Sequence, residues 1–318
     1  MRKNKWLIGV LLGLTATSFW ASFYIVGRYL FGENESKIDP LFLTFVRYFT
    51  ASIFLIGVMA YQKKMPVVKE CLRKDLVIFI FLGLTGIVGE GTLVFYSLKY
   101  TTATRSCLLA NASPIFTVIM AYLALNEGMS KSKIFGMLLG FIGISAAILC
   151  RGGSDMYMSS SSIVGDLMAL GSGVCWAAYT VWGARVSNQY GGVVSGSVSI
   201  LFGTVLMVPV VLIGGSSMSL DLPLSVWLGV IYLGVFANAV AYVCWFSALK
   251  YLKAGELGAF GYISAAMTMM LSLLLLRERI NLFFLAALAL VFYGVYLMIK
   301  APHRKVDKDI NTEIVSVK

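Results

Sequence analysis

The sequence predicts an all-α polytopic membrane protein with ten transmembrane helices in two inverted five-helix repeats. Three observations lead to this fold class. Of the 318 residues, 59% are hydrophobic and only 13% are charged, whereas soluble domains average about 45–50% apolar and about 25% charged residues. The apolar residues gather in ten runs, each near the roughly 20 residues that a membrane-spanning helix needs. Similar motifs also recur in both halves of the chain.

Polar, glycine-rich or proline-containing segments separate the ten runs. The predicted spans are 6–31, 41–61, 76–98, 104–125, 133–151, 163–185, 193–214, 225–248, 256–276 and 281–299. The first repeat therefore covers 6–151 and the second 163–300, joined by an extracytoplasmic linker at 152–162, with tails at 1–5 and 301–318. The first run resembles a secretory signal, but its length of about 25 residues exceeds the 7–15 of such a core. We expect it to be an uncleaved span.

The duplication is visible in short motifs. Residues 98–103 (Leu-Lys-Tyr-Thr-Thr-Ala) resemble residues 249–254 (Leu-Lys-Tyr-Leu-Lys-Ala), and at the same offset Glu127 matches Glu278. Because each unit holds five spans, an odd number, the second unit enters the membrane from the opposite side. Inverted repeats of this kind are typical of secondary transporters. We expect Glu127 and Glu278 to form charge pairs near the membrane surfaces or to lock a gate there, and not to bind the substrate.

Lysine and arginine residues indicate the orientation of the spans. If the N-terminus is cytoplasmic, 18 of the 26 Lys and Arg residues fall on the cytoplasmic side, 7 fall outside, and Arg47 lies within the membrane. Cytoplasmic loops carry the excess of positive charge in membrane proteins. We therefore expect a multi-pass protein of the cell (inner) membrane with both termini in the cytoplasm.

The sequence lacks the residues that several classes of function require. The five cysteines are scattered without a CxxC pair, and the sole histidine, His303, lies in the C-terminal tail, so we expect no metal site and no cofactor. Basic runs with interleaved aromatic residues are absent, which argues against nucleic-acid binding. The sequence has no GxxxxGK[ST] motif for ATP and no HExxH or GxSxG catalytic motif. We therefore do not expect an enzyme.

Glu90 is a carboxylate well inside the third predicted span. A charge near the bilayer centre costs roughly 2.5–3.5 kcal/mol on insertion scales, so it usually faces a cavity or a partner. We expect Glu90 to carry protons or to bind a substrate amine. The alternative is a silent ion pair with Arg47. The two residues lie about 13 Å and about 9 Å from the outer ends of their spans, at 1.5 Å per residue, so contact is feasible.

Aromatic and amide side chains recur on helical faces that point toward the expected centre. Span one carries Trp20 and Tyr24 four residues apart, and Trp176 is the equivalent of Trp20 in span six. In span eight, Asn238 and Tyr242 are also four residues apart, so each pair shares one face. We expect these side chains to line a central substrate cavity. The alternatives are close helix packing and, for the tryptophans, an interfacial belt.

A proline interrupts the fourth predicted span near its middle, in the sequence Asn111-Ala112-Ser113-Pro114. Proline removes a backbone hydrogen bond, and the freed groups are tolerated in membranes where they meet protein or a watery cavity. We expect Pro114 to act as a hinge and Asn111 to face the cavity, with a purely structural kink as the alternative. The matching part of span nine has no proline, so the hinge would be asymmetric.

The motifs together resemble the EamA family of the drug/metabolite transporter superfamily. The similar residues are Asp39-Pro40 and Arg47-Tyr48 in span two, 97–103 after span three, 125–128 after span four, Gly136, Gly140 and Gly143 in span five, and 277–279 after span nine. The resemblance covers 6–300 and implies a ten-helix inverted-repeat fold that moves small metabolites, often amino acids, usually outward. Glu90 departs from this pattern, because no family-wide motif requires a carboxylate there.

These features favour a secondary transporter that works by alternating access around a site near the middle of the bilayer. The expected partners are the lipid bilayer and a small-molecule substrate, first of all amino acids or related compounds, with proton coupling through Glu90. The alternative is a proton-coupled exporter of drugs or lipophilic cations. A passive channel or a scaffold is a further class, but an inverted repeat with one central carboxylate fits a carrier better. The residues do not specify the direction of transport or the oligomeric state.

Overall fold

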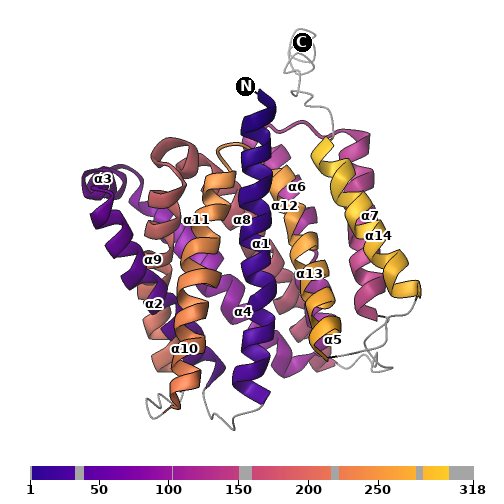
Figure 1. The fold of residues 1–318 in the computed structure, drawn as a ribbon, viewed down its shortest axis with the longest axis horizontal. Helices are drawn as coiled ribbons and strands as arrows, with labels where there is room; N and C mark the ends of the chain where they lie inside the picture. The colour runs from indigo at the N-terminus through magenta and orange to yellow at the C-terminus, as the bar shows by residue number, and fades with distance from the viewer. Residues whose placement is uncertain are drawn as a thin grey trace, which may run out of the picture.

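The computed structural model describes residues 2–32, 39–101, 103–149, 160–215, 222–276 and 282–300, and every regular element within these ranges is helical. The helices form a bundle in which most run roughly parallel to one direction (Figure 1). The first helix, α1, begins at the same end of the bundle at which the last helix, α14, ends. This end is named the terminus face below.

The helices follow the apolar runs along the chain. In the first half they are α1 (Arg2–Gly32), α2 (Pro40–Tyr61), α3 (Met65–Leu82), η1 (Gly83–Gly89), α4 (Glu90–Tyr100), α5 (Ala103–Ala110), α6 (Ser113–Leu125) and α7 (Lys131–Leu149). In the second half they are α8 (Ser160–Tyr190), α9 (Gly192–Ile213), α10 (Leu224–Tyr232), η2 (Leu233–Val240), α11 (Ala241–Ala248), α12 (Ala254–Gly258), α13 (Phe260–Leu276) and α14 (Leu282–Lys300).

The described residues contain six helical stretches that are long and apolar enough to cross a membrane. They are Asn4–Phe23, Leu41–Tyr61, Met65–Val94, Ile163–Tyr190, Gly192–Ile213 and Leu224–Ala248, and two shorter apolar helices cover Ser113–Leu125 and Leu285–Lys300. This agrees with a polytopic membrane protein. The count of ten crossings and the inverted relation of the two halves stay predictions, as do the repeat boundaries. Most of the linker and all of the C-terminal tail lie outside the described residues.

The helices begin or break at positions that three of the predicted spans did not anticipate. The helix of span three begins at Met65 instead of 76, because its charged first turns are helical and the chain bends only at Asp75 (φ −129°, ψ 28°). Span four is two helices, α5 and α6, separated at Asn111 and Ala112. Span nine is also interrupted, at Ala259 between α12 and α13. Both halves of the chain therefore have a break in the corresponding helix. In the first half a proline, Pro114, follows the break, and in the second half no proline is present.

Two π-helical turns, η1 and η2, lie inside spans three and eight. The amide of Ala241 donates to the carbonyl of Phe236, five residues earlier, which is the π-helical pattern. Such turns in longer α-helices are rare and often occur at functional sites. Glu90 directly follows η1, and Asn238 lies within η2. Each turn is therefore next to, or contains, one of the polar residues predicted for the site.

Helices α7 and α14 pack side by side through glycines (Figure 1). A Cβ atom on Gly136 would lie 2.5 Å from the carbonyl oxygen of Gly294, and one on Gly143 would lie 2.8 Å from the amide nitrogen of Val291. Small residues allow backbones to approach this closely, which is how many membrane helices associate. The glycines of span five therefore hold one helix from each half together, away from the candidate site.

Candidate functional site

Four large aromatic side chains from three helices meet in the middle of the bundle. Trp20 of α1 lies with its ring centroid 5.1 Å from Trp176 of α8, 5.6 Å from Tyr242 and 5.0 Å from Trp245 of α11. The Trp20–Trp176 and Trp20–Tyr242 pairs are edge-to-face, with interplanar angles of 83°. Such pairs contribute about 0.5–1.5 kcal/mol beyond the area they bury. The three predicted residues in this group therefore do lie together.

Two tyrosines extend this cluster on its buried side. Tyr179 lies 5.5 Å from Trp176 and 5.9 Å from Tyr242, and Tyr48 lies 6.1 Å from Tyr242. Their hydroxyl groups are satisfied, because Tyr48 and Tyr242 share a hydrogen bond of 2.8 Å and Tyr179 bonds to Ser199 at 2.9 Å. Both tyrosines are fully buried, whereas Trp176 is only half-buried. Tyr48 and Tyr179 therefore form the fully buried side of the cluster, whereas Trp20 and Trp176 keep part of their surface exposed.

Hydrogen bonds hold the tryptophan rings in place. The Nε1 of Trp20 donates to the carbonyl oxygen of Ala237 at 3.0 Å, and the Nε1 of Trp245 donates to Oγ1 of Thr180 at 3.2 Å. Ala237 lies within the π-helical turn η2. Buried indole N–H groups need such partners. The ring orientations are therefore determined by polar contacts as well as by packing.

Arg47 of α2 is the cation of the site. Its Nη1 donates to Oδ1 of Asn238 at 3.1 Å, and its guanidinium lies 4.6 Å from the ring centroids of both Phe23 and Tyr48. Arg47 is 9% exposed and Asn238 is 1% exposed. The Nε of Arg47 and the Nδ2 of Asn238 are nevertheless buried without a hydrogen-bond partner. Most buried polar atoms in native proteins have a partner, so these two donors remain available to an acceptor.

Glu90 faces the same region without a direct partner. Arg47 acts on its charge electrostatically, and its own charge acts on Tyr48, Tyr242 and Cys175. Its carboxylate has no hydrogen bond among the described residues, and no nitrogen of Arg47 lies within 4.0 Å of it. The silent ion pair considered from the sequence is therefore not formed in this structure. Glu90 is half-buried, so part of its side chain remains exposed.

The space beside Glu90 comes from its glycine neighbours. A Cβ atom on Gly91 would meet only the methyl group of Thr44, at 3.9 Å, whereas one on Gly89 would lie 3.0 Å from the sulfur of Cys175. Free space thus lies on one side of Glu90 and packed protein on the other. A larger residue at Gly91 would occupy this free space, whereas one at Gly89 would clash with Cys175.

The remaining predicted residues lie elsewhere or are not described. The Nδ2 of Asn111 donates to the carbonyl oxygen of Cys107 at 2.8 Å, within its own helical segment. Pro114 is buried in the first turn of α6, a position where proline costs no helical hydrogen bond. The chain is broken beside it, as expected, and its role as a hinge stays a prediction. The side chain of Tyr24 lies outside the described residues.

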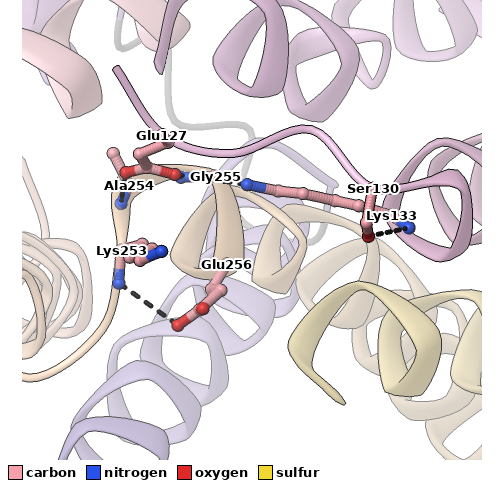
Figure 2. A network of polar contacts seen from close by, with 7 residues as sticks. All are labelled: Glu127, Ser130, Lys133, Lys253, Ala254, Gly255 and Glu256. Atoms are coloured by element: carbon pink, nitrogen blue, oxygen red, sulfur yellow. Dashed lines mark hydrogen bonds and ion pairs between the residues drawn. The ribbon is translucent and has the colours of Figure 1, made fainter. Parts of the chain in front are cut away.

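A charged network on the terminus face joins the two halves of the chain (Figure 2). The carboxylate of Glu127 accepts hydrogen bonds from the amides of Ala254 at 2.7 Å and Gly255 at 3.2 Å, and it pairs with Lys133 at 3.2 Å. The side chains of Glu127 and Lys133 are only 8% and 5% exposed. Glu127 thus ties the end of α6 to the start of α12. The matching Glu278 lies outside the described residues.

One family model matches the chain in two separate stretches. The model of the EamA-like transporter family covers residues 7–149 and again residues 163–300, which together make up nearly the whole sequence. The chain belongs to the EamA-like transporter family. This EamA-like protein is therefore a multi-pass membrane transporter of a small-molecule substrate within the lipid bilayer.

Relatives of this EamA-like transporter come from bacteria and archaea. It is 29% identical over 228 residues to "Uncharacterized transporter YyaM" of Bacillus subtilis, covering 71% of this chain and 74% of that protein. It is 27% identical over 297 residues to an "Uncharacterized transporter" of Archaeoglobus fulgidus, covering 93% and 98%. A crystal structure with 19% identity superposes with a TM-score of 0.79 over 91% of this chain and 95% of the other. This last similarity shows that the fold is shared.

Three residues of the site are missing from the predicted set. Tyr48 directly follows Arg47, Tyr179 lies three residues after Trp176, and Trp245 lies three residues after Tyr242. Residues three apart in a helix share a face, so the last two could have been found from the spacing. Their chemistry gave no separate signal, because buried aromatic side chains are common in any apolar helix. Among the described residues, no group of three His, Cys, Asp or Glu side chains is placed to hold a metal ion.

Proposed function

We propose that this EamA-like transporter is a secondary carrier of amino acids, which it binds as zwitterions between Arg47, Asn238 and Glu90. One observation carries the proposal. Two buried donors that lack an acceptor, the Nε of Arg47 and the Nδ2 of Asn238, lie near a carboxylate that lacks a donor. An α-amino acid supplies the missing acceptor and the missing donor on one short backbone.

The carboxylate of the substrate binds to Arg47 and Asn238. A buried donor without a partner costs about 1–3 kcal/mol, and a bound carboxylate would remove that cost for both groups. Arginine presents its N–H groups in a planar fork that matches a carboxylate. The hydrogen bond between Nη1 and Asn238 already orients this fork, so little ordering is needed when the substrate binds.

The ammonium group of the substrate binds to Glu90. A lone carboxylate inside a membrane protein is stabilised by a cationic partner, and the nearby tryptophan faces attract cations as well. The half-buried surfaces of Trp20 and Trp176 then remain for the substrate side chain. Substrates with apolar or aromatic side chains should therefore bind better than acidic ones.

Proton coupling follows from competition at one carboxylate. Glu90 can hold either a proton or the substrate ammonium as its counter-charge, so release of one favours binding of the other. We propose that the carrier exchanges protons for amino acids by this route, exporting them or exchanging one for another. In the proposed orientation the protein lies in the inner membrane with both termini in the cytoplasm. The terminus face is then the cytoplasmic end of the bundle.

Alternating access requires each end of the site to open in turn. On the terminus face, Glu127 joins the two halves, and Trp245 of the aromatic cluster and its neighbour Phe246 are fully buried. Opening toward this end would therefore separate α6 and α7 from α12. Helix motion around Pro114 fits this step, because α6 begins beside the break at Asn111 and Ala112.

A second candidate is export of lipophilic cations. The exposed tryptophan surfaces and the unpaired Glu90 favour it, since aromatic faces bind cations. A cation would leave the donors of Arg47 and Asn238 without an acceptor, however, and Arg47 would repel it. The amino acid therefore accounts for more of the site than the cation does.

Counterflow in proteoliposomes tests the proposal. Vesicles loaded with a mixed amino-acid pool are assayed by mass spectrometry for the wild type, Glu90→Gln and Arg47→Met, with and without a pH gradient. Glu70→Gln, at an exposed salt bridge (50% exposed), is the matched control for the carboxylate. We expect saturable exchange that falls roughly ten- to hundredfold in both site variants, since hydrogen bonds to charged groups contribute about 1.5–3 kcal/mol each.

Substrate analogues separate the two ends of the site. An amino-acid amide, which keeps only the ammonium group, should be a poor substrate for the wild type. If the amide and the amino acid exchange equally fast, the role of Arg47 is refuted and cation export is favoured. Full, still pH-dependent exchange by Glu90→Gln would refute the role of Glu90. If no amino acid exchanges, the substrate class is wrong.

A further inference from the structure

We propose that a cavity between α3 and α8 binds the headgroup of an anionic phospholipid. The cavity has a volume of about 570 Å³. Its lining combines three cationic side chains with apolar ones: Arg73, Lys74, Asp75, Leu76, Val77, Ile78, Phe81, Trp182 and Arg185. None of these residues belongs to the substrate site described above.

The bend in α3 creates this cavity. Asp75 has non-helical backbone angles, and six consecutive residues, 73–78, line the space. In a regular helix, successive side chains point in all directions around the axis, so six in a row would not face one cavity. The bend lies in the part of α3 near the terminus face (Figure 1), where lipid headgroups meet the protein in the proposed orientation.

Asp75 is the single acidic side chain in this lining, against the three cations Arg73, Lys74 and Arg185, so the lining keeps a net positive charge. Its Oδ2 accepts hydrogen bonds from the hydroxyl of Tyr190 at 2.5 Å and from Nε2 of Gln189 at 3.1 Å. The Nη2 of Arg185 lies 3.8 Å from its Oδ1, so the two form a long ion pair without a direct hydrogen bond. These contacts hold α3 and α8 together at the cavity while the N–H groups of Arg185 remain available.

The cations at the cavity have unused hydrogen-bond donors. Arg73 has no hydrogen bond or ion pair among the residues that the structure describes, and Arg185 is 66% exposed. Lys74 is already paired with Glu70 at 2.6 Å. Arginine binds phosphate oxygens through its planar fork, so Arg73 and Arg185 supply charge complementary to a phosphodiester.

The apolar part of the lining identifies the occupant as a lipid. Val77 is 79% exposed and Leu76 is 42% exposed, so apolar surface continues from the cavity along the outside of α3. Trp182 stacks edge-to-face with Phe81, at 5.5 Å between centroids, and tryptophan is typical of the headgroup level of a membrane. A soluble phosphate would use the arginines but not this surface, whereas an acyl chain would cover it. Basic pockets between helices at the membrane surface are known to suit anionic headgroups.

Lipid retention measured by native mass spectrometry tests the proposal. The purified full-length protein is incubated with phosphatidylglycerol or phosphatidylcholine in detergent, as the wild type and as Arg73→Gln/Arg185→Gln. The control Lys69→Gln/Lys131→Gln removes the same charge from exposed residues outside the cavity. We expect the wild type and the control to retain phosphatidylglycerol preferentially. The arginine variant should bind it about thirtyfold more weakly, since each cation near an anionic lipid contributes about 1 kcal/mol.

A second measurement places the lipid at the cavity. Phosphatidylglycerol with brominated acyl chains should quench tryptophan fluorescence in the wild type, and the quenching should fall in Trp182→Phe. The proposal is overturned if the arginine variant retains phosphatidylglycerol like the control, or if phosphatidylcholine binds equally well. It is also overturned if glycerol phosphate displaces the lipid completely at equal concentration, because the site would then recognise a soluble phosphate. Quenching that is unchanged in Trp182→Phe would place the lipid elsewhere.

Discussion

Replacing Glu127 by glutamine should lower the free energy of unfolding by about 3 kcal/mol. Glu127 and Lys133 form an ion pair of 3.2 Å with side chains only 8% and 5% exposed. Breaking a buried pair by removing one partner costs about 3–5 kcal/mol, because the other charge stays buried without compensation. The glutamine carbonyl can still accept a hydrogen bond from Ala254 or Gly255, so the expected loss lies at the lower end of that range.

Glu70→Gln is the matched control for this prediction. It makes the same change of atoms at a salt bridge of 2.6 Å to Lys74, but both side chains there are about half exposed, at 50% and 51%. Exposed pairs of this kind contribute little to stability, because solvent screens their charges. The two variants therefore differ in burial and in the two backbone amides that only Glu127 binds.

Denaturant unfolding of the purified protein in detergent measures both variants. If Glu127→Gln and Glu70→Gln lose the same stability, the reasoning from burial is refuted. The double variant Glu127→Gln/Lys133→Met checks the cause, because it removes the uncompensated charge and should recover part of the loss. If the double variant is as unstable as the sum of its single variants, the backbone hydrogen bonds, and not the ion pair, dominate.

Two further substitutions test the packing around the aromatic cluster. Trp20→Phe keeps a ring but removes the indole N–H that donates to the buried carbonyl of Ala237. We expect a loss of about 1–3 kcal/mol in unfolding free energy and weaker substrate exchange. Unchanged exchange and stability would contradict a role for this hydrogen bond. Gly86→Ala places a Cβ atom 2.1 Å from the ring of Tyr179 and should cost about 1–3 kcal/mol by overpacking. Gly57→Ala, whose Cβ meets nothing within 4 Å, should be neutral or stabilising by up to about 1 kcal/mol, and equal effects of the two alanines on the unfolding midpoint would refute the steric argument.

The sequence by itself determined that the protein is helical and apolar enough for a membrane, and which polar residues needed an explanation. Run length and composition are local properties, and a charged residue inside an apolar run is visible in the sequence whatever partner the neighbouring helices supply. Glu90 and Arg47 were therefore evident from the sequence. Helical spacing likewise predicted that Trp20, Trp176 and Tyr242 face a common centre, where they lie within 6.0 Å of one another.

Only the tertiary structure decided which of these residues contact one another. The sequence suggested Glu90 as a partner for Arg47, but the guanidinium binds Asn238, and Asn111 bonds within its own helix. A helix can rotate or slide along its neighbours without any change in its apolar pattern, and a shift of one residue turns a side chain by about 100°. The π-helical turns before Glu90 and around Asn238 add such a shift inside spans three and eight. Partner choice therefore depends on how the whole bundle packs, and the unpaired donors of Arg47 and Asn238 become visible only there.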